Sequence, residues 1–218
     1  MKKTNKKGLI LPVALLLGFA VWTVLISTVD TEPIGPGGSM VGFSALNGFV
    51  FRLTGVNWGL YYITDLLSIV LLFVAFCFGL LGLYQMIKRK SILKVDYSIL
   101  VLGGLYIITV ALYLFFDTVI VNHRPTLIDG VLEASYPSST TLLVLSIMPT
   151  ALMQFKTRIK NIFLKRFTVV LTLIFTVFMV VGRFISGVHW FSDIVVGVLL
   201  GTGLVCLYRY ILALSKRK

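Results

Sequence analysis

Residues 182–193 read GRFISGVHWFSD, and this stretch places Arg183, His189 and Asp193 between two long apolar runs. Apolar runs of about 20 residues predict transmembrane helices. A charged side chain at the centre of a membrane costs about 2.5–3.5 kcal/mol, so charges near such helices usually serve a function. The stretch therefore predicts a connection between two membrane helices that carries candidate functional residues.

The composition extends this prediction to the whole chain. Of 218 residues, 58% are hydrophobic and 13% are charged, whereas soluble domains are about 45–50% apolar and about 25% charged. We therefore expect an all-α membrane protein in which residues 1–218 form a single polytopic domain. The apolar runs predict six transmembrane helices, at about residues 8–29, 58–87, 97–121, 138–155, 167–187 and 190–214.

The distribution of Lys and Arg predicts how the chain crosses the membrane. All but three of the 20 Lys and Arg residues lie near the termini or in the loops after the second and fourth runs. Because cytoplasmic loops carry the excess of positive charge, we expect both termini to be cytoplasmic. The net charge of +12 then reflects topology and attraction to anionic lipids, not a nucleic-acid partner. The exceptions, Arg52, Arg124 and Arg183, are expected on the opposite, outer face. Because this face otherwise has almost no positive charge, the pair Arg124 and Arg183 indicates a bound anion.

Three short segments meet at this outer face in the expected topology: residues 117–125 (DTVIVNHRP), 136–140 (YPSST) and 183–193. The guanidinium groups of Arg124 and Arg183 are expected to bracket one phosphate, because the planar donor fork matches phosphate oxygens. Ser138 and Ser139 open a helix, where free backbone N–H groups favour an anion.

His189 and Asp193 are four residues apart, which places them on one face if this stretch is helical. A carboxylate bonded to one imidazole nitrogen fixes the tautomer and leaves the other nitrogen free as a nucleophile or base. Together with the arginines, this pair predicts phosphoryl transfer through a phosphohistidine. We expect no metal or other cofactor, because the arginines supply positive charge. The alternatives are a snorkelling Arg183, an interfacial His189 and an Asp193 that only neutralises Arg183.

In these motifs the sequence resembles the type 2 phosphatidic acid phosphatase superfamily, the membrane relatives of bacterial acid phosphatases and vanadium haloperoxidases. The family pattern is K-x6-R-P, then P-S-G-H, then S-R-x5-H-x3-D. The matching residues are Arg124, Pro125, Pro137, Ser138, Arg183, His189 and Asp193. The resemblance implies six membrane helices and metal-independent dephosphorylation of lipid phosphates or pyrophosphates. It makes His189 the nucleophile and Asp193 its partner, with Arg124, Ser138 and Arg183 holding phosphate.

Four positions depart from the family pattern. Asp117 stands where the family has lysine, and Gly182 replaces the serine before Arg183. Ser139 and Thr140 replace the glycine and histidine of P-S-G-H. The resemblance makes the missing histidine the general acid that protonates the leaving oxygen, which threonine does not replace at neutral pH.

Three hypotheses account for the missing acid. In the first, the substrate is a lipid pyrophosphate such as undecaprenyl pyrophosphate, whose phosphate leaving group (second pKa about 6) departs without a proton donor. In the second, His123 supplies the proton. In the third, the protein binds a lipid phosphate, or serves another envelope enzyme, without turnover. A lipid transporter is less favoured, because the charges cluster at one face and not at the midplane.

The expected protein is therefore an integral phosphatase of a bacterial cytoplasmic membrane, with its site facing outside and membrane lipids as its surroundings. Asp129 and Glu133 lie near the site in the sequence. We expect them to repel additional anionic groups or to pair with the arginines.

Overall fold

The computed structural model describes residues 6–215. In this range the chain is all-helical, with only isolated bridges of β type. The α-helices are α1 (Lys6–Thr28), α2 (Ser44–Thr54), α3 (Trp58–Arg89), α4 (Tyr97–Thr118), α5 (Ser139–Arg158), α6 (Ile162–Ile185) and α7 (Phe191–Ser215). Predictions that concern Lys2, Lys3, Lys216, Arg217 and Lys218, and the side chains of Lys6 and Lys7, lie outside the described part of the chain.

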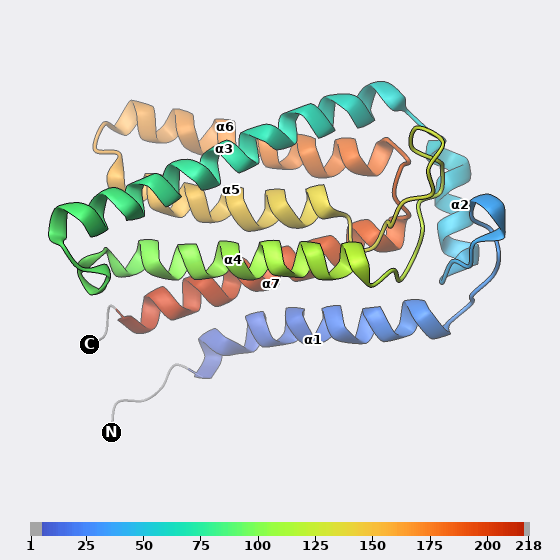
Figure 1. Cartoon of the computed structure of the whole chain (residues 1–218), viewed down its shortest axis with the longest axis horizontal. Helices are drawn as coiled ribbons and strands as arrows, with labels where there is room; N and C mark the ends of the chain where they lie inside the picture. Colours follow the sequence, from blue (N-terminus) through green and yellow to red (C-terminus); the bar gives the residue numbers. More distant parts are fainter. Residues whose placement is uncertain (1–5, 216–218) are drawn as a thin grey trace.

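Six long helices run along one axis, and the short α2 caps one end (Figure 1). Five of the six are long and apolar enough to cross a membrane: α1, α3, α4, α6 and α7. The chain is thus a multi-pass membrane protein. The remaining long helix, α5, corresponds to the predicted span 138–155 but is less apolar. It packs against α3, α4, α6 and α7, so its polar side chains face other helices. Whether all six cross the membrane stays a prediction.

Small residues let α7 approach its neighbours closely. A Cβ at Gly201 would lie 2.9 Å from Cβ of Leu145 in α5, and one at Gly203 would lie 2.9 Å from Cδ2 of Leu16 in α1. Real Cβ atoms do not come this close without a shift of the neighbour. Glycine therefore permits the tight packing of α7 that holds its first turn, with Asp193, in place.

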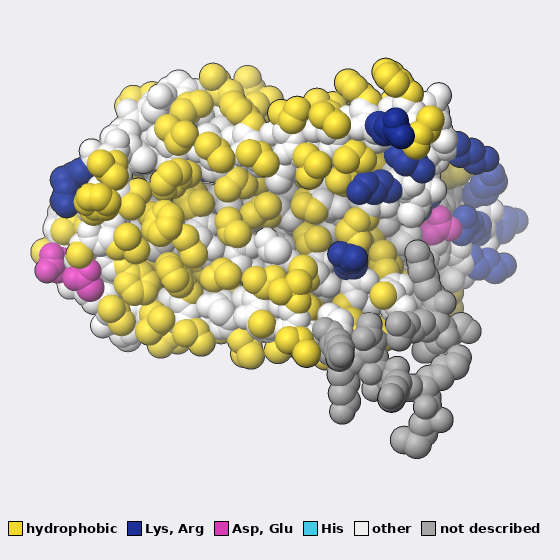
Figure 2. All heavy atoms as spheres, turned by 180° about the vertical axis from the view of Figure 1, so that it is seen from behind, with side chains coloured by type: hydrophobic (Ala, Val, Ile, Leu, Met, Phe, Trp, Pro, Cys, Tyr) yellow, Lys and Arg dark blue, Asp and Glu magenta, His cyan; other side chains and the backbone are white. Residues whose placement is uncertain are grey.

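The surface separates into an apolar middle and a basic end. Exposed hydrophobic side chains cover the middle of the bundle, and most of the visible Lys and Arg side chains gather near one end (Figure 2). The start of α1, the end of α7, the α3–α4 connection and the α5–α6 connection lie at this end (Figure 1). The opposite end holds α2, the long α4–α5 connection and the α6–α7 connection. We call these the basic end and the distal end.

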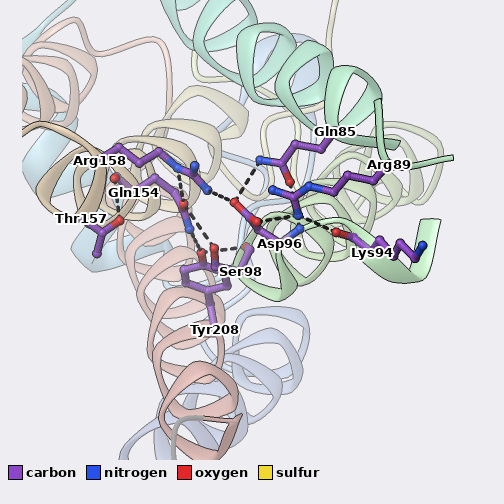
Figure 3. A network of polar contacts seen from close by, with 9 residues as sticks. All are labelled: Gln85, Arg89, Lys94, Asp96, Ser98, Gln154, Thr157, Arg158 and Tyr208. Atoms are coloured by element: carbon purple, nitrogen blue, oxygen red, sulfur yellow. Dashed lines mark hydrogen bonds and ion pairs between the residues drawn. The ribbon is translucent and has the colours of Figure 1, made fainter. Parts of the chain in front are cut away.

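A polar network joins four helices at the basic end (Figure 3). Asp96 accepts hydrogen bonds from Arg89 Nη1 at 2.9 Å, Arg158 Nη2 at 3.1 Å and Gln85 Nε2 at 2.9 Å. Burial raises the pKa of Asp96, but these three hydrogen bonds outweigh it and hold the pKa below its usual value. The network continues through Gln154 to Tyr208, whose hydroxyl donates to the Ser98 carbonyl at 3.1 Å. It therefore ties α3, α4, α5 and α7 together.

Candidate functional site

The α4–α5 connection folds back on itself at the distal end. The backbone N–H of Arg124 donates to the Glu133 carbonyl at 3.0 Å, and that of Ser135 donates to the Asn122 carbonyl at 2.9 Å. The indole N–H of Trp190 donates to the His123 carbonyl at 2.7 Å. These bonds bring two of the three predicted segments, 117–125 and 183–193, against the residues just before α5.

His189 lies in the α6–α7 connection and is 5% exposed. Its Nδ1 is 3.0 Å from the carbonyl oxygen of Ser135, and its Nε2 is 3.2 Å from Nη1 of Arg124. A carbonyl oxygen only accepts and a guanidinium only donates. Nδ1 therefore carries the proton, and Nε2 presents its lone pair.

The surroundings keep the His189 imidazole neutral. Burial lowers its pKa most, and the positive charges of Arg124 and Arg183 lower it further. The hydrogen bond to the Ser135 carbonyl raises it, but the pKa remains well below the usual value of 6.5. A neutral imidazole with an unprotonated Nε2, which here accepts a hydrogen bond from Nη1 of Arg124, is the form that can act as a nucleophile.

Asp193 occupies the first turn of α7 and is fully buried. The predicted direct bond between its carboxylate and His189 is wrong. The hydroxyl of Ser135 lies between them, 3.1 Å from Nδ1 of His189 and 2.5 Å from Oδ2 of Asp193. The physical reason is that α7 begins at Phe191, so His189 precedes the helix and helical spacing does not relate the two side chains.

Neutral donors complete the environment of Asp193. Its Oδ2 also accepts from the backbone N–H of Trp190 at 3.1 Å, and its Oδ1 accepts from Asn122 Nδ2 at 3.3 Å. Helix α2 fixes the start of α7, because Asn47 Oδ1 accepts from the Ser192 N–H at 3.1 Å and its Nδ2 donates to the Ser192 hydroxyl at 2.9 Å. No ion pair reaches Asp193 from residues 6–215.

Arg124 lies between the imidazole and a carboxylate. Besides its contact with His189, its Nε is 3.0 Å from Oε2 of Glu133, and the guanidinium is largely buried. The prediction that Glu133 pairs with an arginine is thus confirmed. The arrangement gives Arg124 donors that can reach an anion placed beside Nε2 of His189.

Arg183 points its guanidinium toward α3. Its Nη1 donates to the Tyr61 carbonyl at 3.3 Å and to the Thr64 hydroxyl at 3.2 Å, and its Nη2 is 3.5 Å from Asp65 Oδ1. The guanidinium also lies over the Tyr61 ring, 4.8 Å from its centroid. The expectation that Arg124 and Arg183 bracket one anion stays a prediction: α3 supplies partners to both Nη atoms of Arg183, and its buried Nε has no hydrogen-bond partner among the described residues.

The two predicted serines differ in position. Ser138 precedes α5 and is fully buried; its N–H donates to the Asp193 carbonyl at 3.1 Å, and its hydroxyl accepts from Thr141 at 3.0 Å. Ser139, the first residue of α5, lines the cavity beside His189. Thr140, at the position of the family histidine, is 4% exposed and does not line that cavity.

A cavity of about 370 Å³ opens beside His189. Its polar lining comes from Tyr113, Asp117, Arg124, Glu133, Ser135, Tyr136, Ser139 and His189. His123, predicted as a possible proton donor, does not contribute to this lining. Within residues 6–215, no three His, Cys, Asp or Glu side chains are grouped as metal ligands. The prediction of a metal-free site stays a prediction.

Sequence analysis missed Ser135 and Asn122. Ser135 directly precedes the YPSST segment and Asn122 directly precedes His123, so both are next to motif residues. Nothing in their spacing, however, indicates that they meet Asp193, because the fold-back of the α4–α5 connection brings them there.

Comparison with known proteins identifies the family and a similar fold. A family model described as the PAP2 superfamily matches residues 68–217. A solved structure, the first transmembrane PAP2 type phosphatidylglycerolphosphate phosphatase from Bacillus subtilis, is similar with a TM-score of 0.59 and 17% sequence identity. The similarity covers 95% of this chain and 96% of that chain. No curated protein sequence matches the chain.

Proposed function

The chain belongs to the PAP2 superfamily, and from this premise we propose that it is a membrane phosphatase that hydrolyses a lipid phosphate or pyrophosphate. The observation that carries the proposal is the state of His189. His189 lines a cavity, and its unprotonated Nε2 accepts from the buried guanidinium of Arg124 at 3.2 Å, a donor that a phosphoryl oxygen can take over when substrate binds. A nucleophile beside a fixed cation suits attack on a phosphorus atom whose oxygens carry negative charge.

In the proposed reaction, the lone pair of His189 Nε2 forms a bond to phosphorus. The bond from phosphorus to the leaving oxygen breaks, and its electron pair goes to that oxygen. The imidazole keeps its proton on Nδ1 and becomes a cation. Water then attacks phosphorus, and the N–P bond breaks with its electron pair returning to Nε2. Inorganic phosphate leaves as H2PO4−, which carries both protons of the attacking water. Arg124 donates to the phosphoryl oxygens throughout.

The leaving group favours a pyrophosphate among the candidate substrates. Thr140 and the imidazole of His123 are not part of the cavity lining, so neither is placed to protonate a leaving oxygen. A departing phosphate ester has a second pKa of about 6 and leaves without such help. A lipid pyrophosphate, such as undecaprenyl pyrophosphate, therefore loses less from the missing acid than a monophosphate does.

We further propose six spans with both termini in the cytoplasm of a bacterium and the site at the outer face of its plasma membrane. The separation of the two ends of the bundle supports this topology. Lys and Arg gather at the basic end, and the α6–α7 connection that contains His189 lies at the distal end, as the positive-inside rule expects for an outward site.

A second candidate function is binding of a lipid phosphate without turnover. The observation that favours it is the ion pair between Arg124 and Glu133, because a cation already paired is less available to a transition state. Turnover separates the two candidates, since a binding protein retains phosphate affinity but releases no phosphate.

Phosphate release by the purified full chain in detergent tests the proposal. Undecaprenyl pyrophosphate, phosphatidic acid and phosphatidylglycerol phosphate are offered in turn, with EDTA present. We expect release that favours the pyrophosphate and is lost in His189→Ala. Lys160→Gln is the control, because Lys160 is exposed in the α5–α6 connection at the basic end, away from the cavity. Binding without release from any of the three substrates contradicts the phosphatase and supports the second candidate.

A further inference from the structure

We propose that the hydroxyl of Ser135 is a positioning group that couples the imidazole of His189 to the carboxylate of Asp193. The inference rests on the proposed function, because it takes Nε2 of His189 as the phosphoryl acceptor. It assigns Ser135 a role in the reaction even though its side chain makes no bond to phosphorus.

The donor and acceptor types fix the direction of each hydrogen bond. Asp193 Oδ2 only accepts, so the Ser135 hydroxyl donates its proton to it at 2.5 Å. The lone pairs of that hydroxyl then face Nδ1 of His189 at 3.1 Å, where they accept from the Nδ1–H. Two hydrogen bonds therefore connect the imidazole to the carboxylate, and in both the proton is donated in the direction of Asp193.

Ser135 supplies a second acceptor to the same proton. Its backbone carbonyl lies 3.0 Å from Nδ1, and its backbone N–H is held by the Asn122 carbonyl at 2.9 Å. Any side chain at position 135 keeps this carbonyl. Removal of the hydroxyl is thus expected to leave the tautomer of His189 intact and to break only the link to Asp193.

The link matters when the imidazole becomes a cation. Asp193 is fully buried, and all its donors are neutral: Ser135, Asn122, Ser192 and the Trp190 N–H. Its negative charge is therefore available to stabilise the positive charge that develops as N–P bond formation proceeds. The Ser135 hydroxyl is the group through which that stabilisation reaches the ring.

Four variants test this role in the full chain: Ser135→Ala, Ser135→Thr, Asp193→Asn and the double variant of Ser135→Ala with Asp193→Asn. Turnover of undecaprenyl pyrophosphate gives kcat and KM, trapping of ³²P-labelled protein gives the phosphohistidine, and thermal unfolding reports folding. We expect Ser135→Ala to lower kcat about 10²-fold, the size of loss that misplacement of a reacting group causes. KM and the unfolding temperature should change little.

Rescue and coupling distinguish positioning from support of the fold. Ser135→Thr retains the hydroxyl and should restore kcat to within about threefold of the wild type. Because Ser135→Ala and Asp193→Asn break one path, the double variant should be no slower than the slower single variant. Additive losses, an unchanged kcat in Ser135→Ala, or a folded Ser135→Thr without rescue would each overturn the inference.

The results that would contradict the proposed function differ from those that would contradict the role of Ser135. Turnover retained in His189→Ala, or absent from the wild type, overturns the phosphohistidine mechanism and the role of Ser135 together. Turnover lost in His189→Ala but unchanged in Ser135→Ala overturns the role of Ser135 alone.

Discussion

The two ends of the bundle each hold an aspartate in a polar cluster, and the partners of the two carboxylates differ. At the basic end, Asp96 is paired with Arg89 at 2.9 Å and Arg158 at 3.1 Å, and about a third of its side chain is exposed. At the distal end, Asp193 is fully buried and receives only neutral donors. A carboxylate paired with cations has its charge compensated and acts as a clamp. A buried carboxylate with neutral donors keeps a charge that can act on a neighbour.

The arginines repeat this contrast. Arg158 contacts Asp96 and, within its own helix, Gln154, whereas Arg183 contacts Asp65 and the Tyr61 carbonyl on α3, and both sets of contacts suit helix packing. Arg124 instead divides its guanidinium between Glu133 and the imidazole of His189. At the distal end, therefore, a guanidinium lies beside the candidate nucleophile His189, which has no counterpart in the Asp96 cluster. The predictions below test the two ends separately.

The largest expected effect is on turnover in His189→Ala. Removing the group that forms the covalent intermediate should lower kcat by more than about 10³-fold, as loss of a nucleophile does in other enzymes. Release of phosphate and trapping of ³²P-labelled protein measure the effect. If labelling persists in this variant, another residue accepts the phosphoryl group. The distal end would then not owe its chemistry to His189.

A smaller effect is expected from Arg124→Lys, with Arg183→Lys as the matched variant. Loss of a fixed donor to the phosphoryl oxygens should lower kcat/KM about 10²-fold for Arg124→Lys without a large fall in the unfolding temperature. Arg183→Lys should mainly lower the unfolding temperature, because its partners lie on α3. Equal losses of kcat/KM with unchanged stability would instead assign both arginines to the phosphate.

These two arginines also illustrate what the sequence predicts and what it leaves open. Apolar runs locate the long helices to within a few residues at most ends, and even the less apolar α5 is found near 138–155. Local motifs indicate His189, Asp193 and Arg124. The direction of Arg183 depends on Tyr61 and Asp65, which are more than a hundred residues away and carry no signal of that contact. The Ser135 link depends on where α7 begins, and sequence patterns set helix boundaries poorly.

The pH dependence of kcat/KM tests the environment of His189. The reaction needs the neutral imidazole, and the pKa of His189 lies well below 6.5, so the nucleophile stays unprotonated as the pH falls through 6.5. For a histidine of ordinary pKa, kcat/KM would fall about tenfold between pH 7.5 and 5.5, whereas we expect a clearly smaller fall for His189. The ionisation of the substrate is measured separately by ³¹P NMR and subtracted. A full tenfold fall in kcat/KM would mean that water reaches the imidazole and that burial does not lower the pKa of His189.

The smallest effect is expected at the basic end, from Asp96→Asn. The substitution removes the charge that Arg89 and Arg158 share, and exposed or half-exposed ion pairs each contribute about 0.2–1 kcal/mol. The two pairs together should therefore contribute about 0.4–2 kcal/mol of stability, and kcat should be unchanged. Because hydrogen bonds hold the pKa of Asp96 below its usual 3.8, its contribution is present above that pH and is lost as the pH falls below it. The stability difference between Asp96→Asn and the wild type should accordingly shrink in acid. An Asp96→Asn variant with unchanged stability but a lowered kcat would contradict this separation. It would show that the ion pairs of Asp96 also influence the geometry around His189.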